Sequence, residues 1–154
     1  MIRFFDIIFS LFGLLILSPI LLLLMVIGYI DLGSPIFRQE RLGKDKNPFR
    51  LIKFRSMHIN APHVATHLAN ISAITTFGRF LRGSKLDELP QLWNVLRGDM
   101  SLVGPRPNLF NQEELIMERD SRVVYSVRPG ITGLAQINKI DMSTPQLLAE
   151  TDAK

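Results

Sequence analysis

Two adjacent carboxylates, Asp87 and Glu88, are the residues best suited to chemistry in this chain of 154 residues. Pro90 follows them, and proline is favoured in the first turn of a helix. The sequence therefore predicts that both carboxylates lie at or just before a helix N-terminus, where the helix dipole favours their ionised forms. Neighbouring side chains diverge, which favours separate roles: one carboxylate as nucleophile or base, the other as a ligand of a divalent cation.

A purely structural role is the alternative for this pair. Acidic residues are common in the first turn of helices, and Ser84, three residues before Asp87, resembles the start of a capping box. The spacing alone therefore leaves open whether Asp87 is a helix cap or a catalytic group.

Positive charge is concentrated in one part of the sequence. The net charge is +4, and residues 38–57 contain Arg38, Arg41, Lys44, Lys46, Arg50, Lys53 and Arg55. Such a cluster, directly after an apolar segment, suits anionic lipid headgroups or phosphorylated substrates. A solvated basic face and a nucleic-acid site are the alternatives. The apolar segment and the lack of interleaved aromatic residues argue against nucleic acid.

Residues 4–30 form an apolar segment whose single charge is Asp6. As a straight helix it would be about 40 Å long, enough to cross a bilayer. Pro19 predicts a kink, and the Ser18 hydroxyl is a candidate partner for the carbonyl that the proline frees. The residues leave two geometries open: a kinked helix that spans the bilayer, or one that enters and leaves by the same leaflet. The Lys and Arg residues downstream place the rest of the chain in the cytoplasm.

The remaining residues predict an α+β fold that is mostly helical, with residues 1–32 as the apolar helix and 33–154 as one domain. We expect a β-hairpin from extended segments 36–42 and 49–57, and an amphipathic helix over 89–97. Further helices are expected over 61–70, 74–81 and 111–121, and a strand over 123–127. His63 and His67 would share a helix face, but no HExxH-like glutamate accompanies them, so we interpret them as a partly exposed face rather than a metal site. The chain has no cysteine, which excludes disulfides and Cys-based metal sites.

Residues 85–107 read KLDELPQLWNVLRGDMSLVGPRP. This run strongly resembles the bacterial sugar transferase family, the monotopic polyprenol-phosphate phosphoglycosyl transferases, in its small form that holds only the catalytic domain. The stretches FRQERLG at 37–43, FRLIKFRSM at 49–57 and RPGITGLAQ at 128–136 are similar to it as well. The likeness covers nearly the whole chain, including Ser18-Pro19.

The resemblance implies a two-step reaction at Asp87. Its carboxylate would attack the β-phosphorus of a UDP-sugar and release UMP, and undecaprenyl phosphate would then take the sugar phosphate from the aspartyl intermediate. Glu88 would bind Mg²⁺, and Lys53, Arg82 and Arg106 match family positions around the phosphate groups. Such a reaction is the first membrane step in making O-antigen, capsule, exopolysaccharide or glycoprotein. The sugar and the oligomeric state stay open.

The resemblance also implies that Ser18-Pro19 turns the first helix back, so that both of its ends stay on the cytoplasmic face of the bacterial inner membrane. This re-entrant helix and interfacial amphipathic helices would hold the site at headgroup depth, next to membrane lipid. The competing hypothesis is a non-catalytic membrane-surface module that binds anionic lipid or a partner through its basic hairpin.

The chain departs from the family pattern in three places. Ile71-Ser72-Ala73 stands where the family commonly has Asp-x-Arg, and Ile137-Asn138-Lys139 replaces a frequent glycine-containing stretch. Relatives usually continue with another helix or strand past the position of Lys154, so we expect either a short variant or a missing C-terminal segment.

Overall fold

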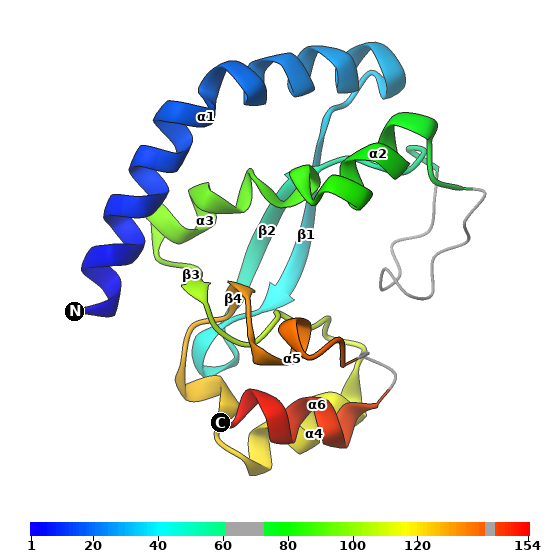
Figure 1. The fold of residues 1–154 in the computed structure, drawn as a ribbon. Coiled ribbons are helices and arrows are strands. Elements are labelled where there is room, and N and C mark those ends of the chain that lie inside the picture. The colour runs from blue at the N-terminus through cyan, green and yellow to red at the C-terminus, as the bar shows by residue number, and fades with distance from the viewer. Residues whose placement is uncertain (61–72, 141–143) are drawn as a thin grey trace.

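The computed structural model describes residues 1–60, 73–140 and 144–154. A long helix, α1, lies along one side of the molecule, a two-stranded hairpin runs through its middle, and short helices gather at the end that holds the C-terminus (Figure 1). In chain order the elements are α1 (Ile2–Leu32), β1 (Ile36–Leu42), η1 (Lys44–Lys46), β2 (Pro48–Phe54), α2 (Thr76–Ser84), η4 (Leu86–Glu88), α3 (Gln91–Arg97), β3 (Ser101–Val103), α4 (Glu113–Ser121), η5 (Val124–Ser126), β4 (Gly130–Thr132), α5 (Leu134–Ile137) and α6 (Pro145–Asp152). The η elements are single turns of 3₁₀ helix.

Helix α1 bends near its middle (Figure 1) and contains Pro19. Proline has no N–H to donate to the carbonyl four residues before it, which is that of Leu15. The Ser18 hydroxyl donates to this carbonyl at 2.8 Å, as the sequence predicted. By length and composition α1 could cross a membrane: its most apolar stretch has a mean hydropathy of 2.8.

The first turns of α1 are attached to the rest of the molecule by polar contacts. The Arg3 guanidinium donates to the carbonyls of Val95 and Leu96, with 2.8 Å to the latter, near the C-terminal end of α3. Asp6 is buried, and its carboxylate accepts hydrogen bonds from the Ser101 hydroxyl and the Leu102 amide at 2.9 to 3.0 Å. Two charged residues, Arg3 and Asp6, therefore fix the start of α1 to α3 and β3.

The second half of α1 packs on the same body through apolar contacts. Leu24 is buried in a cluster with Phe54 of β2 and Leu81 of α2. Gly28 lies so close to Pro35 that an added Cβ would stand 3.1 Å from it. Both halves of α1 thus pack on the same body as the hairpin, while most of its large apolar side chains stay exposed.

The predicted hairpin is confirmed. Strands β1 and β2 pair antiparallel from Ile36 opposite Phe54 to Leu42 opposite Pro48. The second strand ends at Phe54 rather than at Met57, which instead forms an isolated bridge with Ile74.

A second, smaller sheet was not predicted. Strands β3 and β4 pair parallel, with Ser101 opposite Gly130 and Val103 opposite Thr132. The backbone segments of Gly104 and Gly130 come very close together beside these strands. A Cβ on Gly130 would stand 2.1 Å from the Gly104 nitrogen, so this contact requires glycine.

One predicted element is wrong, and one lies outside the described residues. In place of the predicted strand over 123–127, Val124–Ser126 form a 3₁₀ turn, because Val123 before them adopts a left-handed conformation with φ of 59°. The predicted helix over 61–70, with His63 and His67, falls in the range 61–72, outside the described residues.

Candidate active site

The acidic pair lies in a tight connection between two helices, as predicted. Helix α2 ends at Ser84, and Lys85 adopts a left-handed conformation. Asp87 and Glu88 occupy a single 3₁₀ turn, and Pro90 is the N-cap residue of α3. Within the part of the chain that the structure describes, no side chain caps either the 3₁₀ turn or α3. The Ser84 hydroxyl donates back into α2 at 2.8 Å instead, so the capping-box interpretation is wrong.

Asp87 is buried, and its carboxyl group lies among charged side chains. Its side chain is 6% exposed, and its Oδ1 atom has no hydrogen-bond partner among the described residues. Burial raises the pKa of this carboxyl, as does the neighbouring Glu88, while Lys53, Arg82 and Lys85 act to lower it. A desolvated carboxylate oxygen that has no partner and lies near cations is available to act as a nucleophile.

Lys53 of β2 and Arg82 of α2 supply two of these cations. Burial lowers the pKa of Lys53 to about 8; nearby arginines act in the same direction and Asp87 opposes them. The Lys53 ammonium also lies 5.4 Å from the ring centre of Phe37, its partner across the hairpin. Burial lowers the pKa of Arg82, and its Nε donates to the Ser56 hydroxyl at 2.8 Å.

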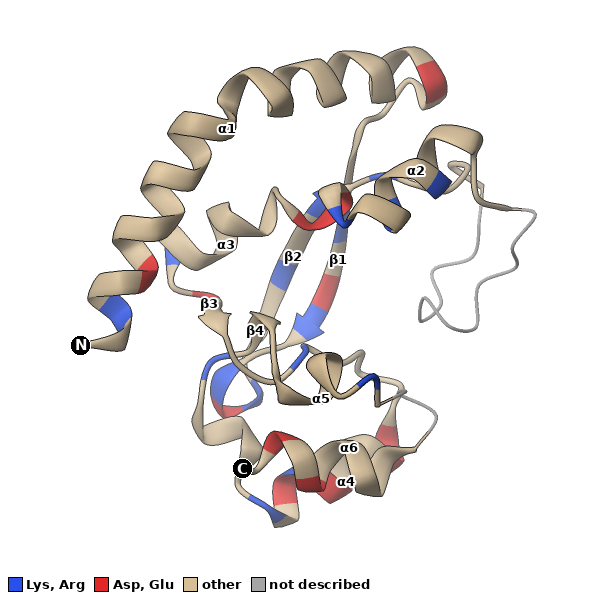
Figure 2. Ribbon diagram, in the orientation of Figure 1, with Lys and Arg blue, Asp and Glu red and all other residues tan. Residues whose placement is uncertain are grey.

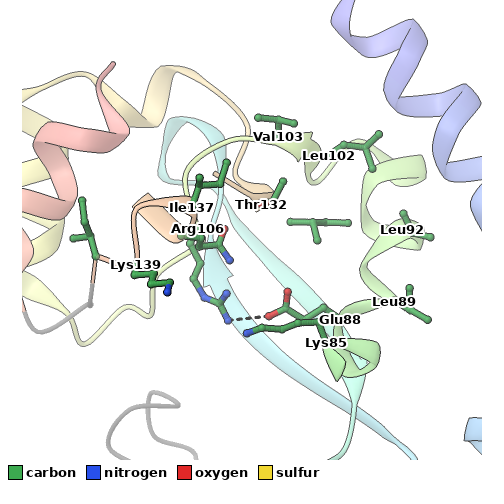
Figure 3. Close-up of a pocket in the computed structure, with 13 residues that line it drawn as sticks. Lys85, Glu88, Leu89, Leu92, Leu102, Val103, Arg106, Thr132, Ile137 and Lys139 are labelled. Atoms are coloured by element: carbon green, nitrogen blue, oxygen red, sulfur yellow. Dashed lines mark hydrogen bonds and ion pairs between the residues drawn. The ribbon is translucent and has the colours of Figure 1, made fainter. Parts of the chain in front are cut away.

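Glu88 points to a different neighbour. Its Oε1 lies 3.1 Å from a guanidinium nitrogen of Arg106 (Figure 3), which stands between Pro105 and Pro107 in the sequence. The acidic turn between α2 and α3 lies close to basic segments of the hairpin (Figure 2). The structure therefore brings together all five residues that the sequence singled out for this site, Asp87, Glu88, Lys53, Arg82 and Arg106; their roles remain predictions.

Two buried arginines that sequence reasoning did not assign to the site hold the loop around Arg106. Arg41 is 6% exposed and donates to the carbonyl of Pro107 at 3.2 Å. Burial and the charge of Arg106 lower the pKa of Arg41 to about 10. On the other side, Arg119 is 1% exposed and donates to the carbonyl of Arg106 at 2.8 Å.

Arg119 is balanced by a carboxylate from the last helix. Asp152 of α6 lies 2.6 Å from its guanidinium, and both side chains are almost fully buried. A second nitrogen contact joins Arg119 to the Asn108 side chain at 2.9 Å. This network links α4 and α6 to the backbone that carries Arg106. No local pattern predicts it, because Arg119 and Asp152 both stand in polar stretches that read as surface.

A cavity of about 740 Å³ lies beside the Glu88–Arg106 ion pair. Its wall combines aliphatic side chains from α3, β3, β4 and the α5 region with Lys85 and Lys139 (Figure 3). Leu89 and Leu92, which the sequence placed on the apolar stripe of a helix, are part of this wall.

The described residues contain no group of three or more His, Asp or Glu side chains arranged to hold a metal ion. Asp87 and Glu88 would nonetheless supply carboxylate oxygens to a Mg²⁺ ion that a bound substrate also holds. This ion is bound in many phosphate sites by one or two carboxylates together with substrate phosphates. The unpartnered Oδ1 of Asp87 and the carboxylate of Glu88 are oxygen donors of that kind.

Residues 1–153 match the model of the family described as bacterial sugar transferase. The chain belongs to this family. A Bacillus subtilis protein described as an uncharacterized sugar transferase, EpsL, is 43% identical to this sugar transferase over 137 residues, covering 88% of the chain and 67% of that protein. The resemblance noted in residues 85–107 and in the three shorter stretches is therefore confirmed.

Two longer relatives carry more specific names. The UDP-glucose:undecaprenyl-phosphate glucose-1-phosphate transferase of Klebsiella pneumoniae is 44% identical over 141 residues, covering 88% of the chain and 30% of that protein. The undecaprenyl-phosphate galactose phosphotransferase of Salmonella typhimurium is 38% identical over 162 residues, covering 92% of the chain and 34% of that protein. The sugar transferase thus spans about a third of the length of these two relatives.

Proposed function

We propose that this sugar transferase moves a sugar-1-phosphate from a UDP-sugar to undecaprenyl phosphate through a covalent intermediate on Asp87. The observation that carries the proposal is the buried Oδ1 of Asp87, which has no hydrogen-bond partner among the described residues and lies among cations. The names of the Klebsiella and Salmonella relatives support the substrate classes. The reaction would begin the synthesis of a bacterial surface glycan or glycoprotein.

The chemistry proceeds in two displacements at one phosphorus atom. An oxygen of the Asp87 carboxylate attacks the β-phosphorus of the UDP-sugar, the bond from this phosphorus to the bridging oxygen breaks, and UMP leaves with that oxygen. A phosphate oxygen of undecaprenyl phosphate then attacks the same phosphorus, and the aspartyl oxygen is released as carboxylate. Each step forms one P–O bond and breaks one, so no other reactant is needed.

The cations around Asp87 stabilise the charge that accumulates in both steps. Lys53, Arg82 and Arg106 come from three different elements and converge on the carboxylate pair. Arginine matches phosphate oxygens with two parallel N–H groups. We assign Mg²⁺ to Glu88, where a bound divalent cation would offset the charge of the diphosphate.

The attachment of α1 supports a re-entrant position in the membrane. Arg3 and Asp6 fix its start to α3 and β3, and Leu24 packs its second half against Phe54 and Leu81. A helix whose two halves pack on the same domain cannot place its ends on opposite sides of a bilayer. We therefore propose that the exposed apolar face of α1 enters one leaflet from the cytoplasmic side and holds Asp87 near the headgroups.

The decisive experiment compares Asp87→Asn with Asp120→Asn in the detergent-solubilised full chain. Asp120 is a half-exposed aspartate in a surface ion pair with Lys46, so its variant controls for the loss of one carboxylate. With a panel of UDP-sugars, Mg²⁺ and no acceptor, the wild type and D120N should release about one UMP per enzyme and gain a phosphosugar adduct on the peptide that contains residue 87. D87N should do neither. Release of UMP by D87N at the wild-type level would overturn the proposal.

The competing membrane-surface module makes the opposite prediction. It would keep its function in D87N and lose it when Arg38, Arg41 and Lys44 are neutralised. The structure weakens this alternative, because Arg41 is buried against Pro107 and is not presented to a surface.

A further inference from the structure

We propose that the cavity beside the Glu88–Arg106 pair binds the acceptor, with its phosphate held by Lys85 and Lys139 and its first isoprene units against the aliphatic wall. This inference rests on the proposed function and specifies where one of its two substrates binds.

The composition of the wall favours a prenyl phosphate over a nucleotide sugar. Seven of the lining side chains are Leu, Ile or Val, and the uncharged polar ones are Thr132 and Gln136. A uridine and a sugar ring carry many donors and acceptors that would need partners in a site built to bind them. An isoprenoid chain carries none, and it gains free energy from contact with aliphatic side chains.

The aliphatic wall is continuous with the membrane helix. Leu92 lines the cavity, and its Cδ1 would stand 3.2 Å from a Cβ placed on Gly13 of α1. Leu92 and Leu102 lie on the side of the cavity toward α1, and Arg106 and Lys139 lie on the other side (Figure 3). A lipid whose chain lies along α1 can therefore bring its phosphate to the cationic end without exposing its first isoprene units to water.

Two lysines in the cavity wall occupy backbone positions that favour glycine. Lys85 has φ of 60° and Lys139 has φ of 56°. Each follows the end of a helix, α2 and α5 respectively, where a left-handed residue is most often glycine because a Cβ is strained in that conformation. With Arg106, these lysines give the cavity three cations against the one carboxylate of Glu88. An excess of positive charge suits a phosphate monoester, which carries close to two negative charges at neutral pH.

Lys85 also connects the cavity to the nucleophile. It lies close enough to Asp87 to act on the pKa of that carboxyl, two residues away on the same connection. A phosphate bound at Lys85 would therefore be near the aspartyl phosphosugar that it must attack.

The glycine preference of both positions provides the test. We would purify Lys85→Gly and Lys139→Gly, with Lys46→Gly as the matched control. Lys46 has the same left-handed conformation, with φ of 60°, but lies in the hairpin turn, where it pairs with Asp120. Because glycine relieves the backbone in all three, each variant should fold at least as well as the wild type.

We expect the KM for undecaprenyl phosphate to rise about tenfold in each of K85G and K139G, the loss typical of one charge-assisted hydrogen bond. In K139G the KM for the UDP-sugar and the amount of UMP released without acceptor should stay at wild-type values, and K46G should match the wild type throughout. Ile137→Gln, a change at an exposed wall residue, should also raise the KM for the acceptor only.

Two results would overturn the inference: a rise in the KM for the UDP-sugar instead, or an unchanged acceptor KM in both lysine variants. Failure of the proposed function looks different, because the wild type itself would then release no UMP.

Discussion

The pKa of Lys53 gives the sharpest prediction about activity. Burial and neighbouring arginines lower it from an ordinary value of 10.5 to about 8, so the free enzyme loses this charge near the upper end of the physiological range. If the ammonium is needed to bind the diphosphate, kcat/KM for the UDP-sugar should be halved near pH 8. It should fall about tenfold for each further pH unit, because one proton is lost.

The same shift has the opposite effect on folding. Between pH 8 and 10.5 the unfolded chain would keep the Lys53 proton while the folded protein has lost it, so the unfolded state binds more protons in this range. Stability therefore rises with pH across this window, by up to about 3 kcal/mol from this group. Loss of the Lys53 proton therefore does not unfold the protein, and it cannot lower activity above pH 8 in that way.

The assay is UMP release from the UDP-sugar between pH 6 and 10 in the wild type, Lys53→Arg and Lys44→Arg. A guanidinium stays charged over this range, so K53R should lose the alkaline fall even if its activity at pH 7 is reduced. Lys44 is exposed in the hairpin turn, and K44R should keep the wild-type profile. An alkaline fall with the same midpoint in K53R would refute the assignment to Lys53.

Two further predictions concern the fold and its place in the membrane. Gly130→Ala should lower the free energy of unfolding, measured by denaturant titration, by about 3 kcal/mol, because its Cβ would collide with the Gly104 backbone. In the same titration Gly83→Ala in α2 should be neutral or slightly stabilising, because its Cβ would have no described atom within 4 Å. The chain has no cysteine, so Ile2→Cys and Asp31→Cys each introduce a single label site, one near each end of α1. In inside-out vesicles a membrane-impermeant maleimide should label both, whereas labelling of one alone would indicate a spanning helix.

Elements with a strong local pattern could be predicted from the sequence. The hairpin followed from two extended segments separated by a turn, and the acidic connection followed from Pro90. The small sheet could not be predicted, because β3 and β4 have three residues each and pair across a sequence separation of about thirty residues. Three residues are too few to show an alternating pattern.

The candidate site also contains some residues that the sequence predicts and others that it does not. The paired carboxylates and the cations near them could be picked out because their residue types suit phosphate chemistry. Arg41 and Arg119 could not be recognised from the sequence, because a charged residue in a polar stretch predicts a solvated surface. Their partners come from other parts of the chain. Arg41 contacts the carbonyl of Pro107, and Arg119 contacts the carbonyl of Arg106 and the carboxylate of Asp152. The different surroundings of Asp87 and Glu88 also depend on the fold, since among the described residues Glu88 forms an ion pair with an arginine and Asp87 does not.

Within the site, Glu88 and Arg106 neutralise each other's charge. A lone anion that draws Arg106 away would leave Glu88 without its counterion in a partly buried place, and a lone cation that draws Glu88 away would do the same to Arg106. Only a ligand that brings both signs of charge compensates both residues at once. For the proposed reaction, this pairing predicts that free phosphate and free metal bind less tightly than a diphosphate that carries its own counterion.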